Sequence, residues 1–270
     1  GISALILGKI YRIPVIIHEQ SSLIPNYFMR FPDGIIARFA MNRARIILTP
    51  SEALRKNVED FKVRNEFRIV PNTVDTKIFH PLPFREGDGT KKLLLVANLG
   101  VVKGVAYLLH ALTQVKQERQ DFFLDIVGDG VLRSELEELA KSLGLGERVR
   151  FHGFKPNHEV AQFMRKCDFY VLPSLSENLP CVLIETTACG KPVVASDVGG
   201  VREIMSEENS ILVSPKNVEA LTQAIKQMLD NYANYSPEKI AQYAKKRFSY
   251  EAVGKTLDQI YSYVAKRDKR

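Results

Sequence analysis

Two glutamates flank the predicted start of a short helix. Glu177 and Glu185 stand with seven residues between them in the stretch SENLPCVLIETTACG, residues 176–190. Pro180 suits the first turn of a helix, and Gly190 suits its end. Amides at a helix N-terminus favour phosphate, whereas an ionised carboxylate only accepts hydrogen bonds and suits hydroxyls. The stretch therefore predicts a site for a diphosphate that lies between two hydroxyl-bearing groups, as in a nucleotide-sugar.

The spacing of the two glutamates is a weak signal by itself, because any acidic helix can provide it by chance. The surroundings of Glu185 strengthen it. This residue lies in the apolar and small stretch CVLIETTACG, where a charge is costly unless it has a partner. We therefore favour a functional role for this block over a structural one.

Three further candidates lie where predicted strands end. Lys103 follows the apolar run 91–99 and precedes a helix, so it could reach a diphosphate as a point charge. The glycines of VGDG (127–130) would let the backbone approach a ligand closely, although a tight turn explains them equally well. His18 ends the run 14–19 and could orient a hydroxyl or transfer a proton. A lone histidine at a strand end is, however, more often structural.

The elements that must position these residues alternate between strand and helix. Strands are predicted at 14–19, 44–51, 68–72, 91–99, 122–128, 148–154, 168–174 and 192–197. Helices are predicted at 51–61, 104–118, 131–144, 158–167, from Pro180, and at 218–232, 237–247 and 250–266. The segment 80–90 is rich in proline, glycine and charge and is typical of a linker. We therefore predict an α/β fold of two Rossmann-like parallel sheets that face a cleft, with ligands beyond the carboxyl ends of the strands.

The composition is that of a globular protein with a basic surface. Of the 270 residues, 45% are apolar and 26% are charged, and the net charge is +7. Basic residues cluster at 38–45, 245–247 and 266–270, which indicates either solvated helix faces or docking to an anionic membrane surface. No nucleic-acid-binding motif accompanies the charge, so we expect no nucleic-acid partner.

The cysteines and the lengths of the apolar segments indicate in which cellular compartment the protein is expected. Cys167, Cys181 and Cys189 form no CxxC pair and have apolar neighbours, so we expect buried free thiols and neither a metal site nor a disulfide. No signal peptide is evident, and no run of about 18 apolar residues could span a membrane. We therefore expect a cytoplasmic protein, with any membrane contact peripheral at the inner face.

Taken together, these blocks resemble family 4 glycosyltransferases, which are retaining enzymes of the GT-B fold. The segments that carry the resemblance are 70–81, 96–112, 124–154, 172–204 and 246–264. The segment 172–204 contains the E-x7-E motif of the family and is the most specific of the five. The resemblance implies a partial acceptor-side domain at 1–84, a nucleotide-sugar-binding domain at 85–245 and a helix at 246–270 that crosses back to the first domain.

The resemblance also implies a role for each matching residue. Glu177 would bind hydroxyls of the donor sugar, Glu185 would bind the ribose, and Lys103 would bind the diphosphate. His18 would lie near the reacting centre on the acceptor side, which makes His18 and Glu177 the expected catalytic residues. Phe154 would lie near the base. The remaining donor-binding positions are Asn98, Asn178, Leu179, Pro180 and Val182.

The activity implied is transfer of a hexosyl group from a nucleotide-diphosphate-sugar to a saccharide or lipid-linked acceptor, with retention. Such a reaction belongs to the synthesis of cell-surface polysaccharides or glycolipids. The family is metal-independent and this sequence has no DxD motif, so we expect neither a metal nor another cofactor. The nucleotide-sugar would be a substrate.

Two departures from the family leave alternatives open. Asn98 stands where many members have arginine, and the first domain starts part-way through its usual span, without the first strands and the glycine-rich loop. The chain could therefore be a non-catalytic fragment that binds a nucleotide-sugar. It could also be a sugar-nucleotide epimerase of the same architecture, or a glycoside hydrolase, which likewise uses paired carboxylates.

Overall fold

The computed structural model of the 270-residue chain describes residues 1–21, 28–82 and 89–267. The chain forms two compact units. The first consists of Gly1–Thr73 together with Tyr250–Arg270, and the second of Val74–Ser249. Within the described residues, no helix is long and apolar enough to cross a membrane.

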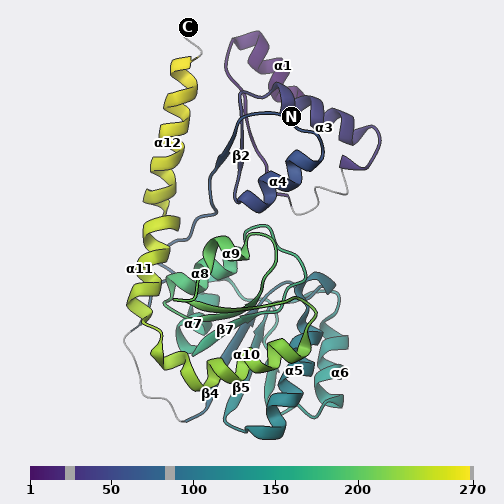
Figure 1. Cartoon of the computed structure of the whole chain (residues 1–270), viewed down its shortest axis with the longest axis vertical. Helices are drawn as coiled ribbons and strands as arrows, with labels where there is room; N and C mark the ends of the chain where they lie inside the picture. Colours follow the sequence, from purple (N-terminus) through teal and green to yellow (C-terminus); the bar gives the residue numbers. More distant parts are fainter. Residues whose placement is uncertain (22–27, 83–88, 268–270) are drawn as a thin grey trace. The chain divides into compact units, whose positions relative to one another are not determined.

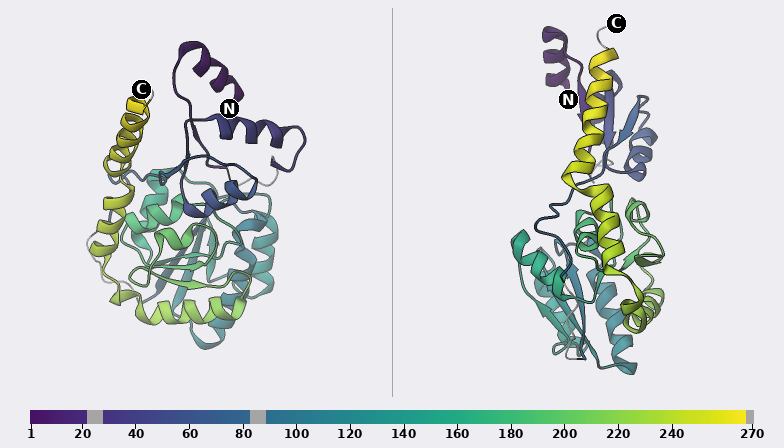
Figure 2. Two further views of the ribbon diagram at one scale, coloured as in Figure 1. Left: turned by 45° about the horizontal axis from the view of Figure 1, so that its top comes forward. Right: turned by 90° about the vertical axis from the view of Figure 1, so that its left-hand side faces the viewer.

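The first unit is built on a parallel three-stranded sheet in the order β1-β2-β3. Its strands are β1 (Ile16–His18), β2 (Ile46–Thr49) and β3 (Phe67–Ile69). Its helices are α1 (Ile2–Tyr11), α3 (Asp33–Arg43), α4 (Glu52–Asp60) and α12 (Tyr250–Arg267). In Figure 2, α1 and α3 lie close together in this unit, and they contact one another.

The central strand β2 is buried on both faces. Ile47 packs in a cluster with residues of α3 and α4, whereas Ile46 and Leu48 pack against Val253 and Ile260 of α12. This explains why the run is continuously apolar rather than alternating. The last helix of the chain therefore belongs to the first unit.

The second unit is built on a parallel six-stranded sheet in the order β6-β5-β4-β7-β8-β9. Figure 1 labels its strands β4, β5 and β7. Its strands are β4 (Lys91–Val96), β5 (Phe122–Val127), β6 (Val149–Phe151), β7 (Phe169–Leu172), β8 (Val193–Ser196) and β9 (Ser210–Val213). Its helices are η1 (Val101–Lys103), α5 (Val105–Glu118), α6 (Arg133–Ser142), α7 (Asn157–Lys166), α8 (Cys181–Ala188), α9 (Val201–Ile204), α10 (Val218–Asn231), η2 (Tyr232–Asn234) and α11 (Pro237–Phe248).

Helices cover both faces of this sheet. Residues of α5, α6 and α10 form one apolar cluster with the strands, and residues of α7, α8, α9 and α11 form the other. The caps follow from the sequence: Asn217 accepts from the amide of Ala220 at the start of α10, and Ser236 accepts from Lys239 at the start of α11. The two parallel sheets confirm the predicted α/β fold class.

The observed division differs from the predicted domain limits. The first boundary lies between Thr73 and Val74 rather than at residue 84. The reason is packing, because Val74 and Phe79 are buried in the core of the second unit, and Arg165 donates to the carbonyl of Ile78 at 2.7 Å. The second boundary lies after Ser249 rather than after residue 245, because α11 continues to Phe248. Part of the predicted linker, residues 83–88, lies outside the described residues.

Candidate functional site

A cavity of about 570 Å³ lies beyond the carboxyl ends of β4 and β5, where a doubly wound sheet binds its ligands. Its lining comes from the loops after β4, β5 and β6 and from helices α7 and α8. The residues are Val96, Ala97, Asn98, Val127, Gly128, Asp129, Gly130, Phe154, Lys155, Asn157, Val160, Val182 and Glu185.

Backbone hydrogen bonds hold the loops around this cavity together. The amide of Gly128 donates to the carbonyl of Gly153 at 2.8 Å, and the amide of Leu99 donates to Asp129 at 2.9 Å. Gly128 has φ +127°, and a side chain there would overlap the carbonyl oxygen of Ala97. Gly128 is therefore needed for close approach of two backbones within the protein, a structural reason that differs from the tight turn considered from the sequence.

Tyr170 fixes the end of β4 from inside the sheet. Its side chain is fully buried, and its hydroxyl donates to the carbonyl of Val96 at 2.8 Å and accepts from the amide of Val96 at 3.1 Å. Burial raises the pKa of Tyr170, so the hydroxyl keeps its proton and can donate. These two hydrogen bonds position Val96, which lines the cavity.

Lys103 and Glu177, which are distant in sequence, form an ion pair in the second unit. Lys103 Nζ lies 2.6 Å from Glu177 Oε1, and Ser174 Oγ donates to the same oxygen at 2.7 Å. The Glu177 side chain is 9% exposed and that of Lys103 is 26% exposed. No hydrogen bond to the second carboxylate oxygen of Glu177 is seen among the described residues, so Oε2 is the oxygen that a ligand could approach.

Two glycines allow the loops that carry this pair to meet. Gly104 has φ +63° and comes so close to the carbonyl of Pro173 that a side chain would overlap it. The amide of Leu175 also donates to Val102 at 2.7 Å, which joins the lysine loop to the loop after β7. Gly199, with φ +51°, allows the same close approach to the carbonyl of Glu177. The geometry of the ion pair is thus set by backbone contacts on both sides.

Glu185 lies within α8 in a partly buried, poorly solvated position. Burial raises the pKa of Glu185 to about 7, and no charged partner opposes this shift. The carboxylate makes no hydrogen bond or ion pair that the structure shows within its described residues. No described side chain therefore offsets the free-energy cost of burying the charge of Glu185. The carboxylate can instead accept hydrogen bonds from the hydroxyl groups of a ligand.

The start of α8 brings these charged groups near one another. Burial raises the pKa of the Cys181 thiol, the charges of Glu185 and Glu177 raise it further, and Lys103 lowers it. Cys181 is exposed, so the prediction of three buried thiols is wrong for this residue and correct for Cys167 and Cys189. The reason is position, because Cys181 occupies the first turn of the helix at its solvent-facing end.

The structure brings several predicted donor-binding residues to one place. Asn98, Phe154, Val182 and Glu185 line the same cavity, and Phe154 is 78% exposed there. Lys103 and Glu177 form the ion pair described above. The role of each of these residues stays a prediction. Among the described residues, no three His, Cys, Asp or Glu side chains gather closely enough to hold a metal ion.

The other predicted positions need separate comment. Asn178 and Leu179 lie in the loop before α8, and Leu179 is buried in the core, so it could offer a ligand its backbone. Pro180 is the N-cap of α8 rather than part of its first turn. His18 ends β1 in the first unit, where burial lowers its pKa and Gln20 Nε2 lies 3.1 Å from its Nε2. Its role at a reacting centre stays a prediction.

Sequence reasoning missed Ser174, Tyr170 and Gly199. The signal for Ser174 was present, since a serine directly after a buried strand and three residues before Glu177 can turn back to that carboxylate. No comparable signal pointed to Tyr170 or Gly199, because their contacts join segments that are far apart in sequence.

Comparison with known proteins gives the family. The family model described as "Glycosyl transferases group 1" matches residues 79–247. The chain therefore belongs to the glycosyl transferases group 1 family, and the resemblance noted from the sequence is confirmed. The fold class, two parallel Rossmann-like sheets of the GT-B type, agrees with this assignment.

Several curated proteins are similar to this chain. An uncharacterised glycosyltransferase of Methanocaldococcus jannaschii is 34% identical over 179 residues, which cover 64% of this chain and 45% of the relative. The MMP alpha-(1->4)-mannosyltransferase of Mycolicibacterium hassiacum is 32% identical over 190 residues, 68% of this chain and 45% of the relative. The alpha-monoglucosyldiacylglycerol synthase of Streptococcus pneumoniae is 24% identical, over 77% of this chain and 52% of the relative. The chain thus spans about half the length of these relatives.

Solved structures share the fold. Anabaena HepE in complex with UDP matches with a TM-score of 0.84 and 24% identity, over 96% of this chain and 74% of that protein. The same protein in complex with UDP-glucose matches with a TM-score of 0.82 and 23% identity, over 97% of this chain and 76% of that protein. At this level of identity the match establishes the fold alone.

Proposed function

We propose that this chain carries the donor site of a retaining hexosyltransferase. The enzyme would move a sugar from a nucleotide-diphosphate-sugar to a saccharide or lipid-linked acceptor, in cell-surface polysaccharide or glycolipid synthesis. The observation that supports this best is the start of α8, where Lys103, Glu177 and Glu185 gather beside a cavity at the carboxyl ends of the strands. Glu185 has no hydrogen-bond or ion-pair partner in the part of the chain that the structure describes. Three relatives, of which this chain covers about half, have names of sugar-transferring enzymes.

In this proposal the nucleotide occupies the cavity. Glu185 accepts hydrogen bonds from the two ribose hydroxyls, which replace the hydration that burial removes from its carboxylate. Phe154 lies at the base end and Asn98 near the phosphates. Asparagine has a neutral amide group where an arginine would have a charged guanidinium group with two parallel donors, so this phosphate contact contributes less to the binding free energy.

The diphosphate is held by Lys103 and by the first turn of α8. An ammonium group has three donors, and Glu177 takes one of them, so Lys103 can keep its ion pair while it donates to a phosphate oxygen. The backbone of Asn178–Val182 adds amide donors, except at Pro180, which has no N–H, and the positive end of the helix. These groups would stabilise the charge that develops on the leaving diphosphate in the transition state.

The donor sugar is positioned by Glu177. Its Oε1 already accepts from Lys103 and Ser174, so the carboxylate is held in one orientation and Oε2 is presented to the sugar hydroxyls. His18 acts on the acceptor side, and transfer proceeds with retention and without a metal. Retention is tested by the anomeric configuration of the product in an NMR spectrum, and metal independence by turnover in excess EDTA.

The first unit supports a peripheral site at the inner face of the cytoplasmic membrane. None of the side chains of α1 is buried, and those of Ile6, Leu7 and Ile10 are more than half exposed, beside the basic Lys9 and Arg12. Apolar side chains with neighbouring cations suit an anionic bilayer surface. The test is co-sedimentation with phosphatidylcholine vesicles that contain phosphatidylglycerol. Equal binding to vesicles without the anionic lipid would contradict the electrostatic part of this proposal.

The proposed donor site is tested by calorimetric titration of the chain with UDP, GDP, ADP and the corresponding glucose conjugates, in buffer with EDTA. We expect one base to bind, and Glu185→Ala to weaken that binding. We expect Glu177→Ala to impair transfer and to leave binding of the free nucleoside diphosphate nearly intact. No binding by any of the six, either to this chain or to one extended upstream, would refute the donor site. Product formed from donor alone would favour an epimerase.

A further inference from the structure

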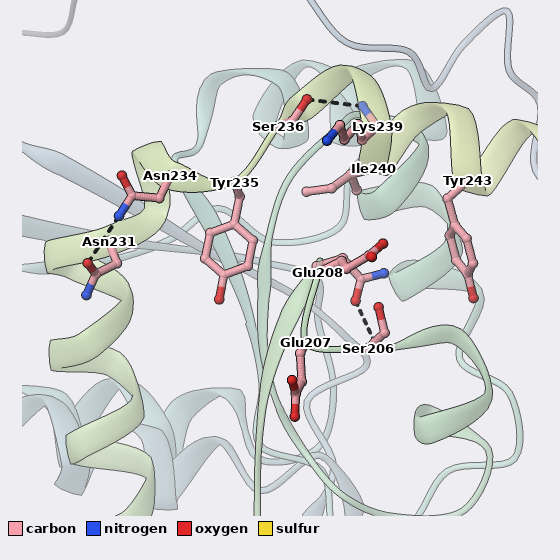
Figure 3. Close-up of a pocket in the computed structure, with 11 residues that line it drawn as sticks. Ser206, Glu207, Glu208, Asn231, Asn234, Tyr235, Ser236, Lys239, Ile240 and Tyr243 are labelled. Carbon is pink, nitrogen blue, oxygen red and sulfur yellow. Dashed lines mark hydrogen bonds between the residues drawn. The ribbon is translucent and has the colours of Figure 1, made fainter.

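A second cavity lies at the other edge of the six-stranded sheet, before the amino end of β9. Its volume is about 440 Å³, within the roughly 300–1,000 Å³ of small-molecule sites. Three segments form it: the loop before β9, the end of α10 with η2, and the first turns of α11 (Figure 3). All the strands of this sheet are parallel, so this cavity is at the opposite end from the proposed nucleotide site.

Apolar and aromatic groups occupy the centre of this cavity. Figure 3 shows Tyr235 between the two asparagines, Asn231 and Asn234, and Glu208. Ile240 is buried beside it. The hydroxyl of Tyr235 makes no hydrogen bond with the residues that the structure describes, although the residue is partly buried. A half-buried phenol with an unused donor is a natural contact for a ligand with one apolar and one polar face.

The rim of the cavity combines hydrogen-bond donors and hydrogen-bond acceptors. The carboxylates of Glu207 and Glu208 and the ammonium of Lys239 form no ion pair within the described residues. Asn234 Nδ2 donates to Asn231 Oδ1 at 3.2 Å, which leaves the oxygen of Asn234 as an acceptor. The rim therefore offers both acceptors and donors, as suits a ligand with several hydroxyl groups.

The charges around the cavity select against anionic ligands. Two carboxylates, Glu207 and Glu208, outnumber the single ammonium of Lys239, so the rim repels an anion. The aromatic ring and the polar rim together suit a neutral molecule that packs an apolar ring face on Tyr235 and presents hydroxyls to the carboxylates and amides. Pyranose sugars have this combination, because their C–H bonds form an apolar face and their hydroxyls lie at the edge.

From this arrangement we infer that the cavity is a second binding site, specific for a neutral saccharide and separate from the nucleotide-sugar site. The inference rests on the residues of this cavity and not on the proposed transfer reaction.

The test is saturation-transfer difference NMR with the methyl glycosides of maltose, mannobiose and chitobiose. Digalacturonate serves as an anionic counterpart. We expect a signal from at least one neutral glycoside, and for digalacturonate none above background. Tyr235→Ala should raise the dissociation constant about tenfold or more, through loss of the ring and its hydroxyl. Because Tyr235 also packs against the core, the exposed double variant Glu207→Gln and Glu208→Gln provides a second test that leaves the fold intact.

The control variant is Glu138→Gln, which makes the same chemical change on the exposed face of α6. It should leave the saccharide signal unchanged. No signal from any of the three neutral glycosides would overturn the inference, as would an equal signal from digalacturonate. A signal that survives both cavity variants would also overturn it. Loss of the signal in Glu185→Gln would place the saccharide in the nucleotide cavity and would likewise refute a second site. None of these outcomes depends on whether the chain binds a nucleotide.

Discussion

The affinity of this chain for a nucleotide-sugar should depend on pH through a single side chain, Glu185. Burial raises the pKa of this carboxyl to about 7 in the ligand-free protein. The ionised form can accept one hydrogen bond at each oxygen from the two ribose hydroxyls, whereas protonation turns one of these oxygens into a donor. We therefore expect the measured affinity to follow the ionised fraction of Glu185.

The size of the effect follows from that pKa. At pH 8 about 90% of Glu185 is ionised, and at pH 6 about 10%, for a pKa of about 7. A ligand that needs the ionised form has its apparent dissociation constant divided by that fraction. The dissociation constant should therefore rise about tenfold between pH 8 and pH 6. Because binding and ionisation are linked, the protein should also release a proton when the ligand binds near pH 7.

Isothermal titration calorimetry measures both quantities. A sugar nucleotide is the suitable ligand, because its diphosphate is esterified at both ends and loses the phosphate ionisation near pH 6 that free nucleoside diphosphates have. Titrations in two buffers of different ionisation enthalpy would report the released proton. Glu185→Gln is the matched control, and its affinity should be weak and nearly independent of pH. The same dissociation constant at pH 6 and pH 8 in the unaltered protein would refute the assignment of Glu185 to the ribose.

The same carboxyl should make the ligand-free protein less stable as the pH rises. The pKa of Glu185 in the folded protein is above the ordinary glutamate value of 4.5, so the folded protein binds more protons than the unfolded chain between about pH 4.5 and pH 7. The contribution of Glu185 to the free energy of unfolding is fully present below pH 4.5 and is lost as the pH rises through 7. The pKa shift corresponds to a loss of about 3 kcal/mol in the free energy of unfolding. Urea unfolding at pH 5 and pH 8 should show this loss, and Glu185→Gln should remove most of it.

Three other substitutions test the positioning contacts. Ser174→Ala removes one of the two side-chain donors to Glu177 and should lower kcat/KM about tenfold. This is the low end of the effect expected for a hydrogen bond to a charged group, because Lys103 still donates to the carboxylate. An unchanged kcat/KM would mean that Lys103 alone orients the carboxylate. Tyr170→Phe should cost about 1–3 kcal/mol in urea unfolding, since both backbone groups of Val96 lose their partner. Gly199→Ala should weaken nucleotide-sugar binding in calorimetry, because its methyl group would displace the backbone of Glu177.

The sheet architecture could be predicted from the sequence because its signals are local. The runs at 91–99, 122–128, 168–174 and 192–197 each contain an observed strand. In β7 and β8 every residue is buried, which favours a nearly continuous apolar run. Strand β9 was missed because its four residues, Ser210–Val213, form a short edge strand with only partial burial. The same reasoning explains the domain limit. The linker composition at 80–90 is a local signal, whereas the burial of Phe79 in the core of the second unit depends on residues distant in sequence.

The site could be predicted only in part, for the same reason. Local patterns identified a helix start with a carboxylate on either side and a lysine at another strand end. They could not show that Lys103 and Ser174 meet on one oxygen of Glu177, because that contact depends on how the loops after β4 and β7 pack together. The buried side chain of Leu179 was likewise invisible in a pattern that marked the whole segment as ligand-binding.

The two carboxylates of the motif differ in their surroundings, and this difference explains their placement. Glu177 lies in a loop outside the helix, where side chains from two other positions donate to it and fix one oxygen. Glu185 lies inside the helix, where its own segment supplies only apolar and small neighbours and where burial raises its pKa to about 7. A fixed carboxylate suits a sugar that must be held in one orientation for reaction. A carboxylate without a partner suits a ribose, because the ligand itself then supplies the missing hydrogen bonds and its binding becomes coupled to a proton.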